Sequence, residues 1–154
     1  MDVVSNLIQL INKKKLENRI KRNEGYSNTA YEDQLGYLTI GYGHLVRKKD
    51  KIKKEKKYTK DYLEKLFNKD FNSAIKSYKK IFKNHKIPNQ IQGVLIEMIF
   101  QLGERGFRKF KKLIRSVKDK QYTNTTKEMK NSKWYKQTPK RAKKLILIVN
   151  ENNE

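Results

Sequence analysis

Apolar residues recur at helical spacing through the first 24 positions of the chain. Side chains three or four positions apart share one face of an α-helix, so such a face can pack against a core. Glu24 continues the spacing, and Gly25 follows it as a residue that often ends helices. The pattern predicts one or two helices ending near Gly25, with Glu24 at the C-terminal end. The apolar positions are Val3, Val4, Leu7, Ile8, Ile11, Leu16 and Ile20.

The pattern changes between residues 29 and 46, where β-forming side chains surround three glycines. Gly36, Gly41 and Gly43 supply turn positions among these side chains. The segment predicts a small hairpin or a three-stranded sheet, and it is the only β structure that the sequence indicates. The β-forming residues are Tyr31, Tyr37, Leu38, Thr39, Ile40 and Tyr42.

A basic segment and a long amphipathic helix come next. Residues 47–57 hold eight Lys or Arg side chains in eleven positions, and Ile52 is the single apolar residue among them. Charge runs of this kind are solvated, so the segment predicts a loop. Thr59 can cap a helix over residues 59–79. The apolar face of that helix comprises Leu63, Leu66, Phe67, Phe71, Ala74, Ile75 and Tyr78.

The rest of the chain shows only helical spacing. Pro88 opens one helix, and Gly103 is placed to end it. The later signals are the apolar spacing of residues 107–117, the capping-box pair Thr125 and Glu128, and the Thr138-Pro139 start of a last helix.

These elements predict a mainly helical α+β fold in a single domain. A small hairpin-containing lobe would span residues 16–58, and a larger helical lobe would span residues 80–154. The helix over residues 59–79 would join them, and residues 1–15 would form an N-terminal extension. The length of 154 residues suits one domain, and no Pro/Gly/Ser linker divides it.

The composition adds a large positive charge. The chain has 38 Lys and Arg against 16 Asp and Glu, a net charge of +22. This surplus attracts polyanions over roughly a Debye length, about 8–10 Å in physiological salt. Nucleic acid, anionic lipid and bacterial wall polymers all qualify, so charge alone does not identify the partner.

Other chemistries are excluded by what the sequence lacks. It contains no Cys and only two His residues, which excludes disulfides, thiolate ligands, cysteine nucleophiles and a multi-histidine metal site. We therefore expect no metal and no cofactor. The first apolar stretch is too short for a membrane span and precedes its basic run, the wrong order for a signal peptide. These features predict a soluble cytosolic product.

Two carboxylates in different surroundings are candidates for acid and base chemistry. Glu24 would end a helix, Asp33 would lie near the hairpin turn, and Thr39 would lie in the next strand. Unlike environments can keep one carboxyl protonated and the other ionised, as glycosidic cleavage requires. On spacing alone, the alternative is that neither residue is catalytic: Glu24 would only end a helix and Asp33 would only form a turn.

The surrounding residues resemble the phage lysozyme family of glycoside hydrolases, the T-even phage endolysin type. The resemblance covers roughly residues 16–150, with several separated motifs in the same order. The motifs are Asn23-Glu24-Gly25, Tyr31-Glu32-Asp33, Gly36-Tyr37-Leu38-Thr39-Ile40-Gly41-Tyr42-Gly43-His44-Leu45, Glu64-Lys65-Leu66-Phe67-Asn68-Lys69-Asp70, Phe100-Gln101-Leu102-Gly103-Glu104, and residues 132–142 around Thr138-Pro139-Lys140-Arg141.

The resemblance implies roles for individual residues. Glu24 would be the general acid, Asp33 would position or activate a water, and Thr39 would help to hold it, with inversion of configuration. Arg141 would pair with Glu24 and orient it; otherwise it is a solvated cation.

The resemblance also implies a saccharide cleft lined by Leu45, Phe100 and Gln101. Plain packing for Leu45 and Phe100, and an exposed polar side chain for Gln101, are the alternatives. His44 and Asp70 match an ion pair that is not catalytic. Trp134 is expected in the core rather than stacked on a sugar.

The resulting hypothesis is a muramidase that cleaves the β-1,4 bond between N-acetylmuramic acid and N-acetylglucosamine. Its partners would be bacterial peptidoglycan and, by charge, anionic wall polymers, with no specific nucleic acid and no membrane span. It would act as a monomer, made in the host cytoplasm and acting on the wall after release. The alternatives are a catalytically silent cationic module that binds wall or nucleic acid on the same fold, and a membrane-disrupting cationic protein.

Overall fold

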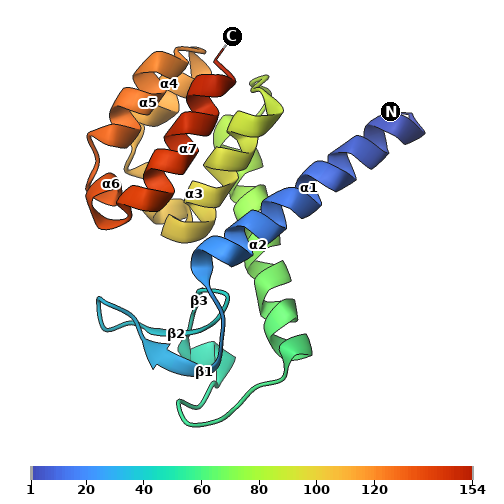
Figure 1. Ribbon diagram of the computed structural model, residues 1–154, viewed down its shortest axis with the longest axis vertical. Helices are drawn as coiled ribbons and strands as arrows, with labels where there is room; N and C mark the ends of the chain where they lie inside the picture. Colours follow the sequence, from blue (N-terminus) through green and yellow to red (C-terminus); the bar gives the residue numbers. More distant parts are fainter. Residues whose placement is uncertain (1, 154) are drawn as a thin grey trace. The chain divides into compact units, whose positions relative to one another are not determined.

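The computed structural model describes residues 2–153, without the side chain of Ile11. The chain forms two compact units, one up to Ser73 and one from Ala74 onward. The first carries a three-stranded sheet together with helices, and the second is helical. The predicted fold class, α+β and mainly helical, is confirmed (Figure 1).

The first unit opens with one long helix, α1, Val3–Glu24. The Asp2 side chain caps it by accepting a hydrogen bond of 2.7 Å from the Ser5 backbone N–H. Gly25 ends it with a φ of 74°, and its N–H donates to the Lys21 carbonyl. The predicted end near Gly25 is confirmed, and one continuous helix replaces the alternative of two. The Ile11 side chain, a predicted apolar position of this helix, lies outside the described residues.

The predicted β region forms an antiparallel sheet in the order β1-β2-β3. Its strands are β1 Ser27–Glu32, β2 Leu38–Gly41 and β3 His44–Leu45. Thr39 is the Cα partner of Tyr31 on one side and of Leu45 on the other. Because side chains alternate along a strand, Leu38 and Ile40 share one face and Thr39 lies on the other. The core under the sheet is built on Ala30, Ile40 and Leu63, with Leu38, Val46, Ile52, Tyr58, Tyr62 and Leu66 packed against it.

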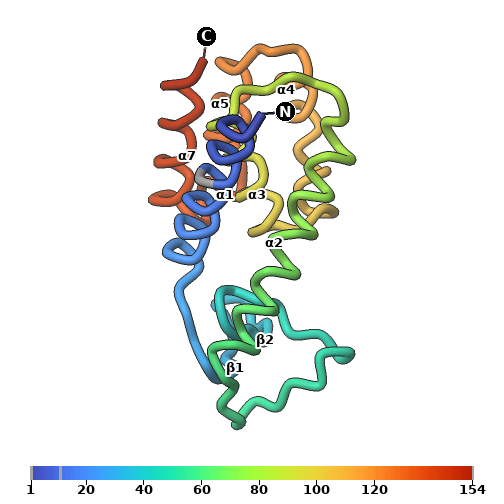
Figure 2. The backbone as a smooth tube through the Cα atoms, turned by 90° about the vertical axis from the view of Figure 1, so that its right-hand side faces the viewer, coloured from blue at the N-terminus to red at the C-terminus, as the bar shows by residue number. Residues whose placement is uncertain are grey.

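The basic segment has exposed Lys and Arg side chains, as the predicted solvated loop requires, together with a few tertiary contacts. The 3-10 helix η1, Lys48–Asp50, interrupts the loop, and Ile52 packs against the core of the sheet. The Tyr58 N–H donates to the Asn28 carbonyl at 2.9 Å and ties the end of the loop to β1. Figure 2 shows this segment running from the sheet to the start of α2. Ile52 and Tyr58 therefore hold the loop against the sheet, while its Lys side chains remain exposed to solvent.

The long helix α2, Lys60–Phe82, belongs to both units. The Thr59 hydroxyl accepts a hydrogen bond of 3.2 Å from the Tyr62 N–H, which confirms the predicted cap. Leu63, Phe67 and Phe71 are buried on the part of α2 within the first unit. Their spacing of four places them on one face, as the apolar pattern predicts.

The second unit contains α3 Asn89–Arg108, α4 Lys111–Lys118, α5 Tyr122–Lys130, α6 Lys133–Gln137 and α7 Pro139–Glu151 (Figure 1). Gly103 interrupts α3 with a φ of 74° and a ψ of 162°, so the predicted break is confirmed. Helical structure resumes after this kink and includes Phe107, as predicted, but Lys109 and Phe110 interrupt it, so the single helix predicted over residues 107–117 is divided in two. Phe107 is fully buried one residue before the end of α3 at Arg108, and the next helix begins at Lys111.

The capping-box prediction for Thr125 and Glu128 is wrong. Helix α5 begins at Tyr122, so Thr125 lies inside it, and its hydroxyl is 2.7 Å from the Ser116 hydroxyl of α4. Packing of α5 against α4 buries both hydroxyl groups, and each hydroxyl is a hydrogen-bond partner of the other. The Thr138-Pro139 start of α7 is confirmed, and Trp134 is buried as expected.

Two kinds of feature are absent from the described residues, a membrane-spanning helix and a metal-binding cluster. Within residues 2–153, no helix is both long and apolar enough to cross a lipid bilayer. Over the same residues, no group of three or more His, Asp or Glu side chains is arranged to hold a metal ion.

Candidate active site

Glu24 is placed by close packing against a glycine of the sheet. It is the last residue of α1, and its carboxylate covers Gly43 in the turn between β2 and β3. A Cβ at position 43 would overlap Glu24 Oε2 and lie 3.0 Å from its Cδ. Gly43 also has a φ of 74°, a conformation that disfavours other residues. The glycine therefore lets the helix end bring its carboxylate against the sheet.

Asp33 is held by the turn between β1 and β2. Its Oδ1 accepts hydrogen bonds of 2.9 Å from the N–H groups of Leu35 and Tyr37. Its own N–H donates to the Tyr37 carbonyl at 2.8 Å. Both bonds to the carboxylate end on Oδ1, so the turn fixes the carboxylate through one oxygen.

Thr39 is connected to Asp33 through the backbone of Tyr37. The Thr39 hydroxyl donates to the Tyr37 carbonyl at 3.2 Å, and the same carbonyl accepts from the Asp33 N–H. Thr39 is buried, on the sheet face opposite Ile40. The structure thus brings Asp33 and Thr39 together on one hairpin. Glu24 contacts the same sheet at Gly43.

The end of α1 is anchored by Lys21, which the sequence did not single out. Its amine is 2.7 Å from Glu64 Oε2 of α2 and 4.8 Å from the ring centroid of Phe67. The hydrogen bond from Lys21 is the main reason that the pKa of Glu64 is lowered. Tyr42 also donates to Glu64 at 3.1 Å. Because Lys21 lies three residues before Glu24, these contacts fix the last turn of α1.

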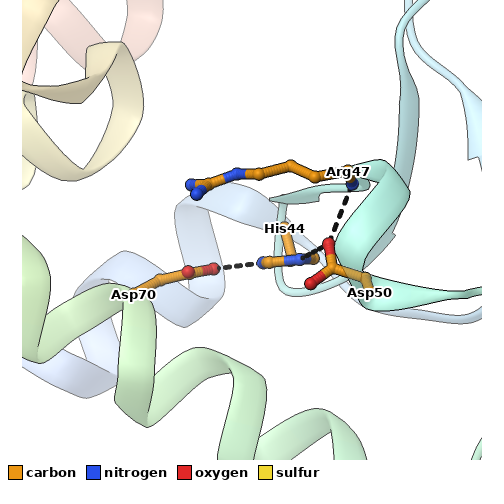
Figure 3. A network of polar contacts seen from close by, with 4 residues as sticks. All are labelled: His44, Arg47, Asp50 and Asp70. Atoms are coloured by element: carbon orange, nitrogen blue, oxygen red, sulfur yellow. Dashed lines mark hydrogen bonds and ion pairs between the residues drawn. The ribbon is translucent and has the colours of Figure 1, made fainter.

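His44 lies between two carboxylates (Figure 3). Its Nδ1 is 2.6 Å from Asp70 Oδ2, which confirms the predicted pair, and its Nε2 is 2.9 Å from Asp50 Oδ2. The same Asp50 oxygen accepts a hydrogen bond of 2.8 Å from the Arg47 N–H. Asp50 was missed because it lies within the basic segment. The sequence did contain one signal, because Asp50 is an acidic residue six positions after His44, a histidine of the predicted β region.

The two carboxylates change the titration of His44. Burial alone would lower its pKa, but the hydrogen bonds and charges of Asp70 and Asp50 raise it above 6.5. Burial likewise opposes ionisation of Asp50, yet the bonds from His44 and Arg47 lower its pKa below 3.8. His44 and Asp50 are therefore both charged near pH 5.

The predicted substrate contacts lie in different parts of the chain. Leu45 is in β3 with an exposed side chain. Phe100 and Gln101 are in α3, both half-buried. The Trp134 indole N–H donates to the Gln101 side-chain oxygen at 2.9 Å, so Gln101 is held in place rather than loose. Their contact with a sugar stays a prediction.

Arg141 pairs with a residue that the sequence did not identify. Its Nε donates to Oε2 of Glu97 at 2.8 Å, and Glu97 is fully buried. The pairing of Arg141 with Glu24 that the resemblance implies stays a prediction. Glu97 escaped notice because it lies in the apolar run of α3, where an acid is stable only with a partner.

The close fit of Glu24 on Gly43 gives a testable consequence. In Gly43→Ala the new methyl displaces the Glu24 carboxylate. For the acid role that the resemblance implies, a misplacement of about 1 Å can cost up to about a hundredfold. We expect turnover of the glycosidic cleavage that the resemblance implies to fall at least about tenfold. Gly103→Ala is the matched control, because Gly103 has the same φ of 74° and open space around it. Equal turnover of the two variants, compared per folded molecule, would contradict the placement.

The His44 network predicts a pH-dependent stability difference. The His44 contribution is complete below its unfolded pKa of about 6.5 and is lost as pH rises through the higher folded value. The Asp50 contribution is present above its unfolded pKa of about 3.9 and is lost as pH falls through the lower folded value. Hence the unfolding free energy of wild type should exceed that of His44→Gln by about 2 kcal/mol near pH 5 and by less at pH 8.5. Urea unfolding at both pH values measures this, and a difference independent of pH would refute it.

The fold and the site together define a class of protein. It is a mainly helical α+β protein whose helix-end glutamate meets a small sheet that carries an aspartate and a threonine on one hairpin. The profile of the phage lysozyme family matches residues 21–148. The chain belongs to the phage lysozyme family.

Individual relatives agree with this membership. Probable T4-type lysozyme 2 of Dictyostelium discoideum is 33% identical over 156 residues, covering 86% of this chain and 92% of that protein. Probable T4-type lysozyme 1 of the same organism is 31% identical over 159 residues, covering 87% and 92%. Peptidoglycan hydrolase gp36 of Pseudomonas phage phiKMV is 29% identical over 124 residues, covering 80% of this chain and 14% of that protein.

Proposed function

We propose that this protein is a peptidoglycan hydrolase, specifically a muramidase that cleaves the β-1,4 bond between N-acetylmuramic acid and N-acetylglucosamine. One observation carries the proposal. Asp33 and Thr39 are tied together through the Tyr37 backbone on the sheet that the Glu24 carboxylate covers. The family membership and the name of the phiKMV relative support the same substrate.

Each residue has a defined part in the proposed reaction. Glu24 donates its proton to the glycosidic oxygen as the bond from that oxygen to the anomeric carbon breaks. A water attacks the anomeric carbon from the opposite side and loses a proton to Asp33. The Thr39 hydroxyl can both donate and accept, so it suits the positioning of that water. The turn occupies Oδ1 of Asp33, which makes Oδ2 the better placed oxygen for the water.

The remaining predicted residues take supporting parts in the proposal. Leu45, Phe100 and Gln101 would contact the saccharide, with Gln101 oriented by the Trp134 indole. The net charge of +22 would draw the protein to anionic wall polymers. Synthesis in the host cytoplasm, action on the wall after release and a monomeric state complete the proposal. No cofactor enters it.

Product analysis of digested peptidoglycan tests the proposed bond. A muramidase leaves new reducing ends on N-acetylmuramic acid and creates no new free amino groups. After digestion of purified peptidoglycan, borohydride should therefore convert the new reducing ends to N-acetylmuramicitol. Reducing N-acetylglucosamine would assign a different glycosidic bond, and new amino groups alone would assign an amidase or peptidase. The absence of any product would favour the silent binding module.

The configuration of the first product tests the role of the water. A water placed between Asp33 and the sugar requires the carboxyl groups to stand about 6.5–9.5 Å apart, whereas direct attack by Asp33 requires about 5–5.5 Å. The water-mediated route inverts the β-linkage, so the first product should be the α-anomer. Proton NMR of a soluble oligosaccharide digest, recorded before mutarotation, reads the anomer directly. A first product in the β configuration would remove the water-positioning role of Asp33 and Thr39.

A further inference from the structure

The first half of α1 presents an apolar face that the other described residues of its own unit leave exposed. Its side chains are between 50 and 82% exposed and lie together on one helix segment, whereas single exposed apolar residues are ordinary on protein surfaces. Figure 1 shows this half of α1 leading away from the sheet of its own unit, which the other end of the helix adjoins. The residues concerned are Val3, Val4, Leu7, Ile8 and Leu10.

These side chains form one continuous stripe. At 100° per residue, the five positions occupy a sector of about 160° around the helix. Ser5, Asn6 and Gln9 occupy the opposite side. A helix segment with this separation is amphipathic over its first turns, although the rest of α1 follows a different pattern.

The charges beside the stripe are positive. Lys13, Lys14 and Lys15 follow it directly with exposed side chains. At the same angular step, Lys14 and Lys15 continue the side of the helix on which the apolar residues lie. Lys14 makes only a loose, exposed contact of 3.7 Å with Glu17. Asp2 is the only acidic residue among residues 2–16, and its carboxylate caps the helix.

We propose that this face of α1 binds the surface of an anionic lipid bilayer. The apolar stripe would enter the boundary between headgroups and acyl chains, and the following lysines would contact anionic headgroups. A helix that lies in the membrane interface combines two features that are both present here, an exposed apolar sector and adjoining cations. This activity is separate from the proposed hydrolysis of peptidoglycan.

The charge distribution favours a membrane over a second copy of the chain as the occupant. Pairing two stripes would bring two sets of lysines and two net charges of +22 together. Their repulsion opposes association, whereas an anionic bilayer neutralises the same charges. Nucleic acid would satisfy the lysines and leave the apolar side chains in water.

Cosedimentation with vesicles tests the proposal on the full chain. Wild type should bind vesicles of phosphatidylglycerol and phosphatidylethanolamine more tightly than vesicles of phosphatidylcholine, and added salt should weaken the binding. Leu7→Gln/Ile8→Gln keeps helix-forming side chains and should weaken binding on the order of a hundredfold, because two large apolar side chains are lost. Asn6→Ala/Gln9→Ala is the matched control on the polar side and should bind as wild type does.

A second pair of variants separates local from overall charge. Lys14→Gln/Lys15→Gln should weaken binding about thirtyfold, because each lysine near an anionic membrane contributes about 1 kcal/mol and two are lost. Lys143→Gln/Lys144→Gln removes the same charge from exposed positions of α7 and should have a smaller effect. Circular dichroism checks that each variant is folded.

Several results would overturn the proposal. They are failure of wild type to bind anionic vesicles, wild-type binding by Leu7→Gln/Ile8→Gln, and equal losses in the two lysine variants. A wild-type dimer that Leu7→Gln/Ile8→Gln converts to a monomer would assign the face to a second copy instead. Peptidoglycan digestion by the same variants is an independent measurement, so failure of the membrane proposal leaves the proposed enzymatic function separately testable.

Discussion

Glu24→Gln should lower the rate of peptidoglycan cleavage by at least on the order of a hundredfold while the protein remains folded. The amide has the size of the carboxyl group, so it can occupy the same place over Gly43. It has no carboxylic acid proton to give to the departing sugar oxygen. The expected loss corresponds to the usual contribution of a positioned general acid. Initial rates of reducing-end release measure it.

The same chemical change elsewhere on the sheet provides the control. Glu32 lies at the end of β1, and its carboxylate makes an exposed contact of 3.5 Å with Lys54. Such surface pairs contribute little, so Glu32→Gln should cleave at a rate close to that of wild type. A folded Glu24→Gln variant with near-normal turnover would remove Glu24 from the mechanism. A large loss in Glu32→Gln would point to a general effect of charge on substrate attraction.

Arg141→Leu should lower the free energy of unfolding by about 3–5 kcal/mol. Glu97 is fully buried and accepts a hydrogen bond from the Arg141 side chain at 2.8 Å. Removing the arginine leaves a buried carboxyl group without this partner, and the cost of a stranded charge exceeds the net value of the pair. Urea unfolding of wild type and variant at the same pH gives the difference.

The double variant Glu97→Leu/Arg141→Leu tests the origin of the lost stability. It distinguishes the cost of the buried Glu97 charge from the cost of losing the Arg141 side chain itself. Replacing both polar groups by apolar ones removes the stranded charge, so part of the lost stability should return. A double variant that is less stable than Arg141→Leu would contradict this account. Turnover per folded molecule of Arg141→Leu addresses the other predicted role. A reduced value would support the orientation of Glu24 by Arg141, and an unchanged value would leave Arg141 a stabilising residue of the helical unit.

The sequence determined the features that depend on short-range periodicity and turn chemistry. The end of α1 at Gly25, the cap at Thr59, the break at Gly103 and the start of α7 at Pro139 are all present. Each depends on a local preference, such as the positive φ of a glycine or the fixed φ of proline. The hairpin that carries Asp33 and Thr39 followed from the alternation of β-formers with glycines for the same reason.

Tertiary packing decided what local patterns could not. Thr125 has the spacing of a cap, but contact between α4 and α5 placed it inside a helix against Ser116. Asp50 looked like part of a solvated loop until the fold brought it to His44.

The partners of the charged residues were likewise invisible in the sequence. Glu97 and Lys21 gained their roles from Arg141 and Glu64, which lie 44 and 43 positions away along the chain. A buried charge needs a partner, and the sequence shows the need without showing the partner. Only the meeting of distant helices selects it, because the pairing depends on distances in space rather than on separation along the chain.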